Sequence, residues 1–135
     1  MNTGSYVGAA IATGVVRTIL NAGFYGFLLA GWFEDLKTAH PGVFREVLPG
    51  YIATDFIFAF AFVYLFAKAG PSLGGGAKGG VCLGILIAIL SPMLGMLYQF
   101  FGVTFLSVGM VATDMAFQVV AHMIVGAVAG AIYKP

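Results

Sequence analysis

Four long apolar runs divide this chain, and only short polar or glycine-rich segments separate them. A helix needs about 20 apolar residues to cross a bilayer, and backbone groups in lipid must be paired within a helix or a closed barrel. Barrel strands would alternate over about ten residues, which these runs do not. The pattern predicts an all-α fold, an integral membrane four-helix bundle. The predicted spans cover roughly residues 8–33, 50–68, 79–102 and 106–133.

Composition agrees with a lipid environment. Hydrophobic residues make up 61% of the chain and charged residues only 8%, with a mean hydropathy of +1.02, whereas soluble domains carry about 25% charged residues. Residues 1–135 are therefore predicted to form a single transmembrane domain. The first apolar run exceeds signal-peptide length, so we expect it to be retained. A net charge of +1 without a basic cluster gives no argument for a nucleic-acid partner.

The charged segment 34–49 is predicted to form a short interfacial helix or loop whose apolar side chains rest in the headgroup region. These side chains are Leu36, Val43, Phe44, Val47 and Leu48. Residues 70–80, "GPSLGGGAKGG", are predicted to form a flexible turn. They lack the full phosphate-loop pattern, so nucleotide binding is not expected there.

Basic residues near the span ends give the predicted orientation. Lys68, Lys78 and Lys134 fall on the side shared by both termini, and Lys37 and Arg45 fall on the other. The positive-inside rule then favours cytoplasmic termini. The predicted location is a bacterial inner membrane, with the lipid bilayer as the first partner.

A short repeat relates the two halves of the chain. The sequence Ala-Thr-Asp occurs at 53–55 and again at 112–114, and Phe58 then aligns with Phe117. Two copies of a helical hairpin with the same topology would be related by a pseudo-two-fold axis along the membrane normal. Coincidence in a low-diversity sequence is the alternative. We favour duplication because both copies place a carboxylate inside a span.

A group of polar residues inside the predicted spans forms a candidate site, which we call the polar seam. It consists of Arg17, Asn21, Tyr25, Asp55, Asp114, Gln118 and His122. Ionisable groups in a span cost about 2.5–3.5 kcal/mol each, so they usually face the bundle interior. In the first span, Arg17, Asn21 and Tyr25 are spaced by four residues, so they follow one face of a helix. In the fourth span, Asp114, Gln118 and His122 have the same spacing and also follow one face. Facing each other, they would form a continuous seam.

The seam has two interpretations. As a structural network it would fix helix register, since interhelical polar contacts contribute about 0.6 kcal/mol on average. As a functional element it would relay protons or ions, or bind a small polar ligand. We assign Arg17 and Asp55 mainly to architecture. Both interpretations stay open for Asp114, Gln118 and His122, and the second copy, facing Arg17 and Asn21, is where chemistry is expected.

Other chemistries find little support. His122 has no second axial ligand, because His40 lies far away in the charged segment. The single cysteine excludes a multi-cysteine metal site, and no serine forms a recognisable nucleophile motif with His122 and Asp114. We therefore expect no metal, no cofactor and no catalytic residues. A membrane enzyme acting on a lipid or quinone ranks last.

Glycines spaced by four are predicted to let helices approach closely, within one chain or between chains. They are Gly80, Gly84, Gly126 and Gly130. The first hypothesis for function is an accessory subunit of a membrane complex, or a homo-oligomer. The alternative is a small proton- or ion-coupled transporter or channel that uses the seam. Since four helices seldom enclose a path alone, this alternative predicts a dimer or higher oligomer.

Two stretches carry a family resemblance. They are "GFYGFLLAGW" at 23–32 and "ATDMAFQVVAHMIVGAVAGAIY" at 112–133. In these stretches the chain resembles small uncharacterised bacterial four-helix membrane proteins. The resemblance implies four helices and no particular chemistry.

Overall fold

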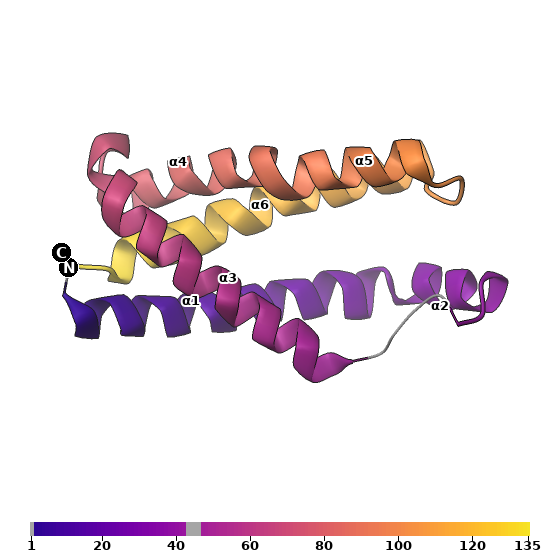
Figure 1. The fold of residues 1–135 in the computed structure, drawn as a ribbon, viewed down its shortest axis with the longest axis horizontal. Helices are drawn as coiled ribbons and strands as arrows, with labels where there is room; N and C mark the ends of the chain where they lie inside the picture. Colours follow the sequence, from indigo (N-terminus) through magenta and orange to yellow (C-terminus); the bar gives the residue numbers. More distant parts are fainter. Residues whose placement is uncertain (1, 43–46) are drawn as a thin grey trace.

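The computed structural model describes residues 2–42 and 47–135, and all regular structure in these ranges is helical. Four helical stretches in this part of the chain are long and apolar enough to cross a membrane, as predicted. At about 1.5 Å per residue, helices of about 25 residues exceed a hydrocarbon core of about 30 Å. The stretches alternate in direction, so both termini lie at the same end (Figure 1). Their bounds are Thr3–Leu28, Leu48–Leu73, Gly76–Gly102 and Val108–Ile132.

The first stretch contains α1 (Thr3–Gly23) and a π-helical turn, η1 (Phe24–Leu28). It begins at Thr3 rather than at residue 8, because the Asn2 side chain caps the helix and accepts a hydrogen bond from Ser5 N at 3.1 Å. The backbone leaves the helical region at Leu29. Residues 30–33, predicted within the first span, therefore belong to the next helix.

That helix is α2, Ala30–Ala39, which overlaps the charged segment predicted to lie at the interface. Leu36 is buried, so it packs on the protein rather than resting in the headgroups. Val43, Phe44 and Arg45, which entered the interfacial and orientation predictions, lie outside the described residues.

The second and third stretches meet at the glycine-rich turn. They comprise α3 (Leu48–Ala69), the 3₁₀ turn η2 (Gly70–Leu73), α4 (Gly76–Ala88), the π-helical turn η3 (Ile89–Met93) and α5 (Leu94–Gly102). Gly74 and Gly75 have φ of 100° and 65°, a region that favours glycine. The turn is shorter than predicted, because α4 begins at Gly76. Pro92 lies within η3, where its missing N–H interrupts the α-helical ladder.

The fourth stretch is α6, Val108–Ile132, which the Ser107 side chain caps by accepting from Met110 N at 3.2 Å. It packs along α4, and α1 packs mainly against α3 and also against α6. In Figure 1, α4, α5 and α6 lie side by side, whereas α3 crosses α1 obliquely. The two helical pairs therefore differ in geometry.

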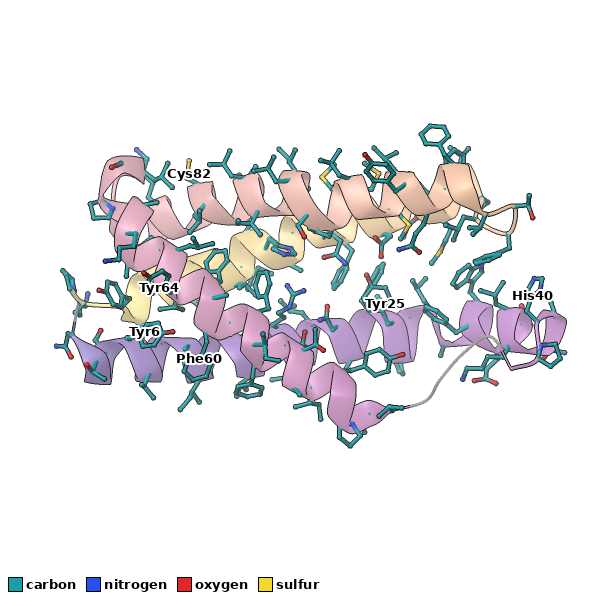
Figure 2. The ribbon with its side chains drawn as sticks, in the orientation of Figure 1. Tyr6, Tyr25, His40, Phe60, Tyr64 and Cys82 are labelled. Carbon is teal, nitrogen blue, oxygen red and sulfur yellow. The ribbon has the colours of Figure 1, made fainter. Side chains whose placement is uncertain are left out.

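The apolar core lies at the end of the bundle that carries the termini. Its buried members are Ala9, Ala10, Phe62, Val63, Phe66, Leu83, Ala129 and Tyr133. Near it, the Tyr6 hydroxyl donates to the Phe60 carbonyl at 3.0 Å, where α1 and α3 cross (Figure 2). The backbone N–H of Lys134 donates to Ser5 Oγ, which joins the C-terminus to α1. The apolar core and these two hydrogen bonds hold the helices together at this end of the bundle.

Small residues bring α4 and α6 into direct backbone contact. The glycines at this contact are Gly80, Gly84, Gly126 and Gly130. A Cβ added at Gly80 would lie 1.8 Å from the Gly126 carbonyl oxygen, and one added at Gly84 would lie 2.1 Å from the His122 carbonyl oxygen. Neither position can hold a larger side chain without separating the helices. The sequence left open whether these glycines pack within or between chains, and the structure uses them within the chain.

Candidate functional site

The polar seam begins with an ion pair between α1 and α3. Arg17 Nε lies 3.0 Å from Asp55 Oδ1, and Asn21 Nδ2 donates to the same oxygen at 2.8 Å. Asp55 is only 5% exposed. A buried charge is costly unless it is paired and hydrogen-bonded, and Arg17 meets that need for Asp55. This half of the seam is electrically compensated.

His122 on α6 is the next member. Arg17 Nη1 lies 3.2 Å from His122 Nε2, and His122 Nδ1 lies 2.7 Å from the Gln118 carbonyl oxygen. A guanidinium has only donors, so Nε2 must accept, and Nδ1 carries the proton that it donates to Gln118. The ring is therefore neutral in this arrangement. Phe58 packs against both groups, with its ring centroid 3.8 Å from Arg17 Cζ.

Asp114, also on α6, has a different environment. The Tyr25 hydroxyl donates to Asp114 Oδ1, and Gln118 Nε2 donates to the Tyr25 oxygen at 2.7 Å. Tyr25 extends from η1 into the space between α1 and the α5–α6 pair (Figure 2). Asp114 is 2% exposed, and no basic side chain in the described part of the chain lies at ion-pair distance from it. Unlike Asp55, this carboxylate has a hydrogen-bond donor but no counter-charge within residues 2–42 and 47–135.

Aromatic stacking fixes the position of Tyr25. The rings of Phe24 and Phe117 stack with their centroids 3.8 Å apart, and Tyr25 meets Phe117 edge-on at 5.6 Å. Offset or edge-on aromatic contacts contribute about 0.5–1.5 kcal/mol beyond burial. The π-helical turn η1 places Phe24 and Tyr25 so that both reach α6. The hydroxyl is thus held next to Asp114.

Two hollows adjoin this carboxylate. The larger, of about 270 Å³, lies between η1, α5 and α6 and is lined by Tyr25, Gln99, Asp114 and Gln118, among others. The smaller, of about 150 Å³, extends toward α2 and is lined by Trp32 and also by Asp114. In the part of the chain that the structure describes, no lysine, arginine or histidine lines either hollow. Asp114 is therefore the buried ionisable acid that faces open space in the described bundle.

All seven residues predicted for the seam lie in one connected set of contacts, but Asn21 and Asp55 are paired differently from the prediction. Arg17 and Asn21 were expected to face the second copy of the repeat. Asn21 instead bonds Asp55, and Arg17 contacts both Asp55 and His122. Figure 1 shows α3 crossing α1 obliquely, and the contacts of Asp55 with Arg17 and Asn21 lie between these two helices. Asp114 instead belongs to the hydrogen-bonded group that Tyr25 and Gln118 form.

Several residues around the hollows were not part of the predicted seam. Gln99 lines both hollows, and a neutral polar residue inside a span was the available signal. Trp32, Phe33 and Phe105 line the smaller hollow. The break at Leu29, which separates α2 from the first membrane-spanning stretch, has no clear signature in the sequence. These aromatic residues could not be assigned to the site without the fold.

Among the described residues, no group of three or more His, Cys, Asp or Glu side chains is placed to hold a metal ion. No protein-family model, curated protein or solved structure matches this chain. The assignment of function therefore rests on the side chains of the seam and the hollows.

Proposed function

We propose that this chain is a small membrane transport protein in which Asp114 binds a proton or a monovalent cation. The observation that carries the proposal is the contrast between the two buried carboxylates. Asp55 is neutralised by Arg17, whereas Asp114 has no counter-charge among the described residues and faces two hollows. Ionisable residues inside membrane spans that line cavities commonly mark ion pathways and proton relays.

The remaining seam residues have supporting roles in this proposal. Tyr25 and Gln118 supply hydrogen bonds around Asp114. His122 and Arg17 connect this group to the compensated ion pair through the Gln118 carbonyl. A change of charge at Asp114 would be felt by this network over a few ångströms in a low-dielectric environment. The proposal retains the expected oligomer, because four helices seldom enclose a path alone.

Proton flux in liposomes tests the proposal. The protein is reconstituted in vesicles that contain a pH-sensitive dye, and a pH gradient is imposed across the membrane. Flux is expected for the wild type and for Asp35→Asn, which removes an exposed carboxylate on α2. It should be lost in Asp114→Asn. Flux that survives Asp114→Asn would refute the assignment of this residue.

An accessory subunit or a homo-oligomer is the second candidate function. Large aromatic side chains such as Phe27 and Phe101 remain exposed on the isolated chain, 82% each, and would suit contact with another membrane protein as well as with lipid. The glycine pairs add nothing to this candidate, because they pack within the chain. Two results together would favour this candidate. Cross-linking in native membranes should yield a stoichiometric complex on purification, and the reconstituted protein should show no proton flux.

The duplication of a helical hairpin is also proposed here. Thr54 Oγ1 donates to the Gly50 carbonyl at 2.8 Å, and Thr113 Oγ1 donates to the Gly109 carbonyl at 2.8 Å. The repeat therefore extends from Ala-Thr-Asp to a glycine four residues before each threonine. Both aspartates follow this motif and both are buried. The same local contact in both halves supports a common origin.

The proposed location is a bacterial inner membrane with both termini cytoplasmic. The two termini lie at one end of the bundle (Figure 1). Lys68 and Lys78 flank the turn at this end, and Lys134 precedes the C-terminal residue. Basic residues near span ends favour the cytoplasmic side. We also propose that the chain is related to small uncharacterised bacterial four-helix membrane proteins.

A further inference from the structure

The two hollows beside Asp114 share one wall. Tyr25, Met96, Gln99 and Asp114 line both of them. A carboxylate therefore stands where a larger, more polar space meets a smaller, more aromatic one. A ligand that occupied both would place its central atoms at Asp114.

The smaller hollow presents aromatic side chains from three directions. Trp32 and Phe33 come from α2 and Phe105 comes from the segment before α6, while Tyr25 comes from η1. Trp32 and Phe33 meet edge-on at 4.8 Å, and Phe33 and Tyr25 meet edge-on at 6.2 Å. Aromatic faces attract cations, and quaternary ammonium groups are recognised by several such faces together. The described lining thus combines aromatic rings with the carboxylate of Asp114.

We infer that the paired hollows bind a hydrophobic monovalent organic cation, a substituted ammonium, with Asp114 as its counter-ion. This inference rests on the proposed function, since it names the cation that would share Asp114 with the proton. An anionic ligand would be repelled by the carboxylate, because none of the described residues that line either space is basic. A hydrated divalent cation would require a set of several oxygen ligands, for which the aromatic and methionine lining is unsuited.

Size and depth narrow the ligand further. The spaces of about 270 and 150 Å³ are each smaller than typical ligand pockets, which span about 300–1,000 Å³. They suit a compact ammonium rather than a drug-sized molecule. Asp114 lies in the second turn of α6, about 9 Å from the helix start at about 1.5 Å per residue. At that depth the ammonium could belong to a free solute or to the choline headgroup of a lipid.

Trp32, the single tryptophan of the chain, makes binding directly measurable. The purified protein in a maltoside detergent free of choline lipids is titrated with phenyltrimethylammonium, and Trp32 fluorescence is followed. Its uncharged counterpart, tert-butylbenzene, has the same shape and serves as the matched compound. We expect a saturable change with the cation and at least tenfold weaker binding of the neutral compound. Equal binding of both would overturn the inference and indicate a purely apolar cavity.

Variants provide the second comparison. Asp114→Asn should weaken binding of phenyltrimethylammonium at least tenfold, and Asp114→Glu should restore most of it. Asp35→Asn, which removes an exposed charge on α2 close in sequence to Trp32, should leave it unchanged. Unchanged binding in a folded Asp114→Asn protein would contradict the inference. The comparison of the two compounds needs no variant, so it decides the question even if Asp114→Asn does not fold.

Lipid composition distinguishes the two sources of the ammonium group. The titration is repeated in vesicles of phosphatidylglycerol with and without phosphatidylcholine. Competition by phosphatidylcholine would assign the site to a lipid headgroup, and unchanged binding would assign it to a free solute; both outcomes support ammonium recognition. Cation binding without proton flux would refute the proposed transport function but support the ammonium-binding site. Proton flux that is lost in Asp114→Asn, without any change of Trp32 fluorescence on titration, would refute the ammonium-binding site but support transport.

Discussion

Arg17 and Asp55 form an ion pair across the contact between α1 and α3, with 3.0 Å between Nε and Oδ1. Both side chains are largely buried, so each depends on the other for charge compensation. Asp114, further along the bundle, is equally buried and has only neutral hydrogen-bond partners among the described residues. The two carboxylates of the repeat thus occupy opposite electrostatic situations.

Breaking the ion pair should destabilise the fold. Arg17→Met leaves a buried carboxylate without its partner, and the expected loss is about 3–5 kcal/mol in the free energy of unfolding. Denaturation in detergent micelles, followed by circular dichroism, measures it. The double variant Arg17→Met with Asp55→Leu should lose less than Arg17→Met alone, because no charge remains buried. A single variant as stable as the wild type would show that the pair contributes nothing.

The backbone contact between α4 and α6 should not tolerate a methyl group. Gly126→Ala would place a Cβ 2.0 Å from the Gly80 carbonyl oxygen, and overpacking of this kind costs about 1–3 kcal/mol. Gly95→Ala on α5 is the matched control, since nothing lies within 4 Å of its added Cβ. There the better helix propensity of alanine should stabilise by up to about 1 kcal/mol. Equal effects at both positions in the same unfolding measurement would contradict the close packing.

Tyr25→Phe should weaken the contact between η1 and α6, although the aromatic ring is kept. The hydroxyl donates to Asp114 and accepts from Gln118, and interhelical polar contacts in membranes contribute about 0.6 kcal/mol each on average. A loss of about 1 kcal/mol in unfolding free energy is expected, together with slower proton flux. Tyr98→Phe, at a position 81% exposed, should change neither quantity. Identical flux in the two variants would exclude a role for the Tyr25 hydroxyl.

His122 should carry its proton on Nδ1 alone. The guanidinium of Arg17 can only donate to Nε2, and the Gln118 carbonyl can only accept from Nδ1. Nitrogen-15 NMR of the reconstituted protein distinguishes protonated from unprotonated ring nitrogens, with His40 as an internal reference. Protonation of both nitrogens of His122 would contradict the contact with Arg17.

The four membrane-spanning helices were predictable from this sequence. How the helices rotate and cross one another was not. Apolar runs long enough to span a bilayer specify four helices almost independently of how they pack. A spacing of four residues likewise places Asp114, Gln118 and His122 on one face of α6. Spacing within one helix says nothing about the tilt of its neighbour, however, and the oblique α3 decides that Asn21 bonds Asp55. The sequence-based assignment to the second copy holds for Arg17, which contacts His122, but not for Asn21, for that reason.

Local breaks explain the rest of what the sequence did not show. The π-helical turn η1 and the break at Leu29 direct α2 toward the segment before α6, which creates the aromatic hollow around Trp32. Neither feature follows from the propensities of "FYGFLL". By contrast, the turn at Gly74 and Gly75 was predictable, since a run of glycines accommodates positive φ.

Infrared difference spectroscopy of the reconstituted protein, recorded between acidic and alkaline pH, tests the central claim most directly. A protonated carboxyl group buried in lipid gives a C=O band distinct from those of exposed carboxyls. We predict such a band in the wild type and in Asp35→Asn, and its loss in Asp114→Asn, because Asp114 exchanges its proton while Asp55 stays paired with Arg17. A buried-carboxyl band that persists unchanged in Asp114→Asn would contradict the account.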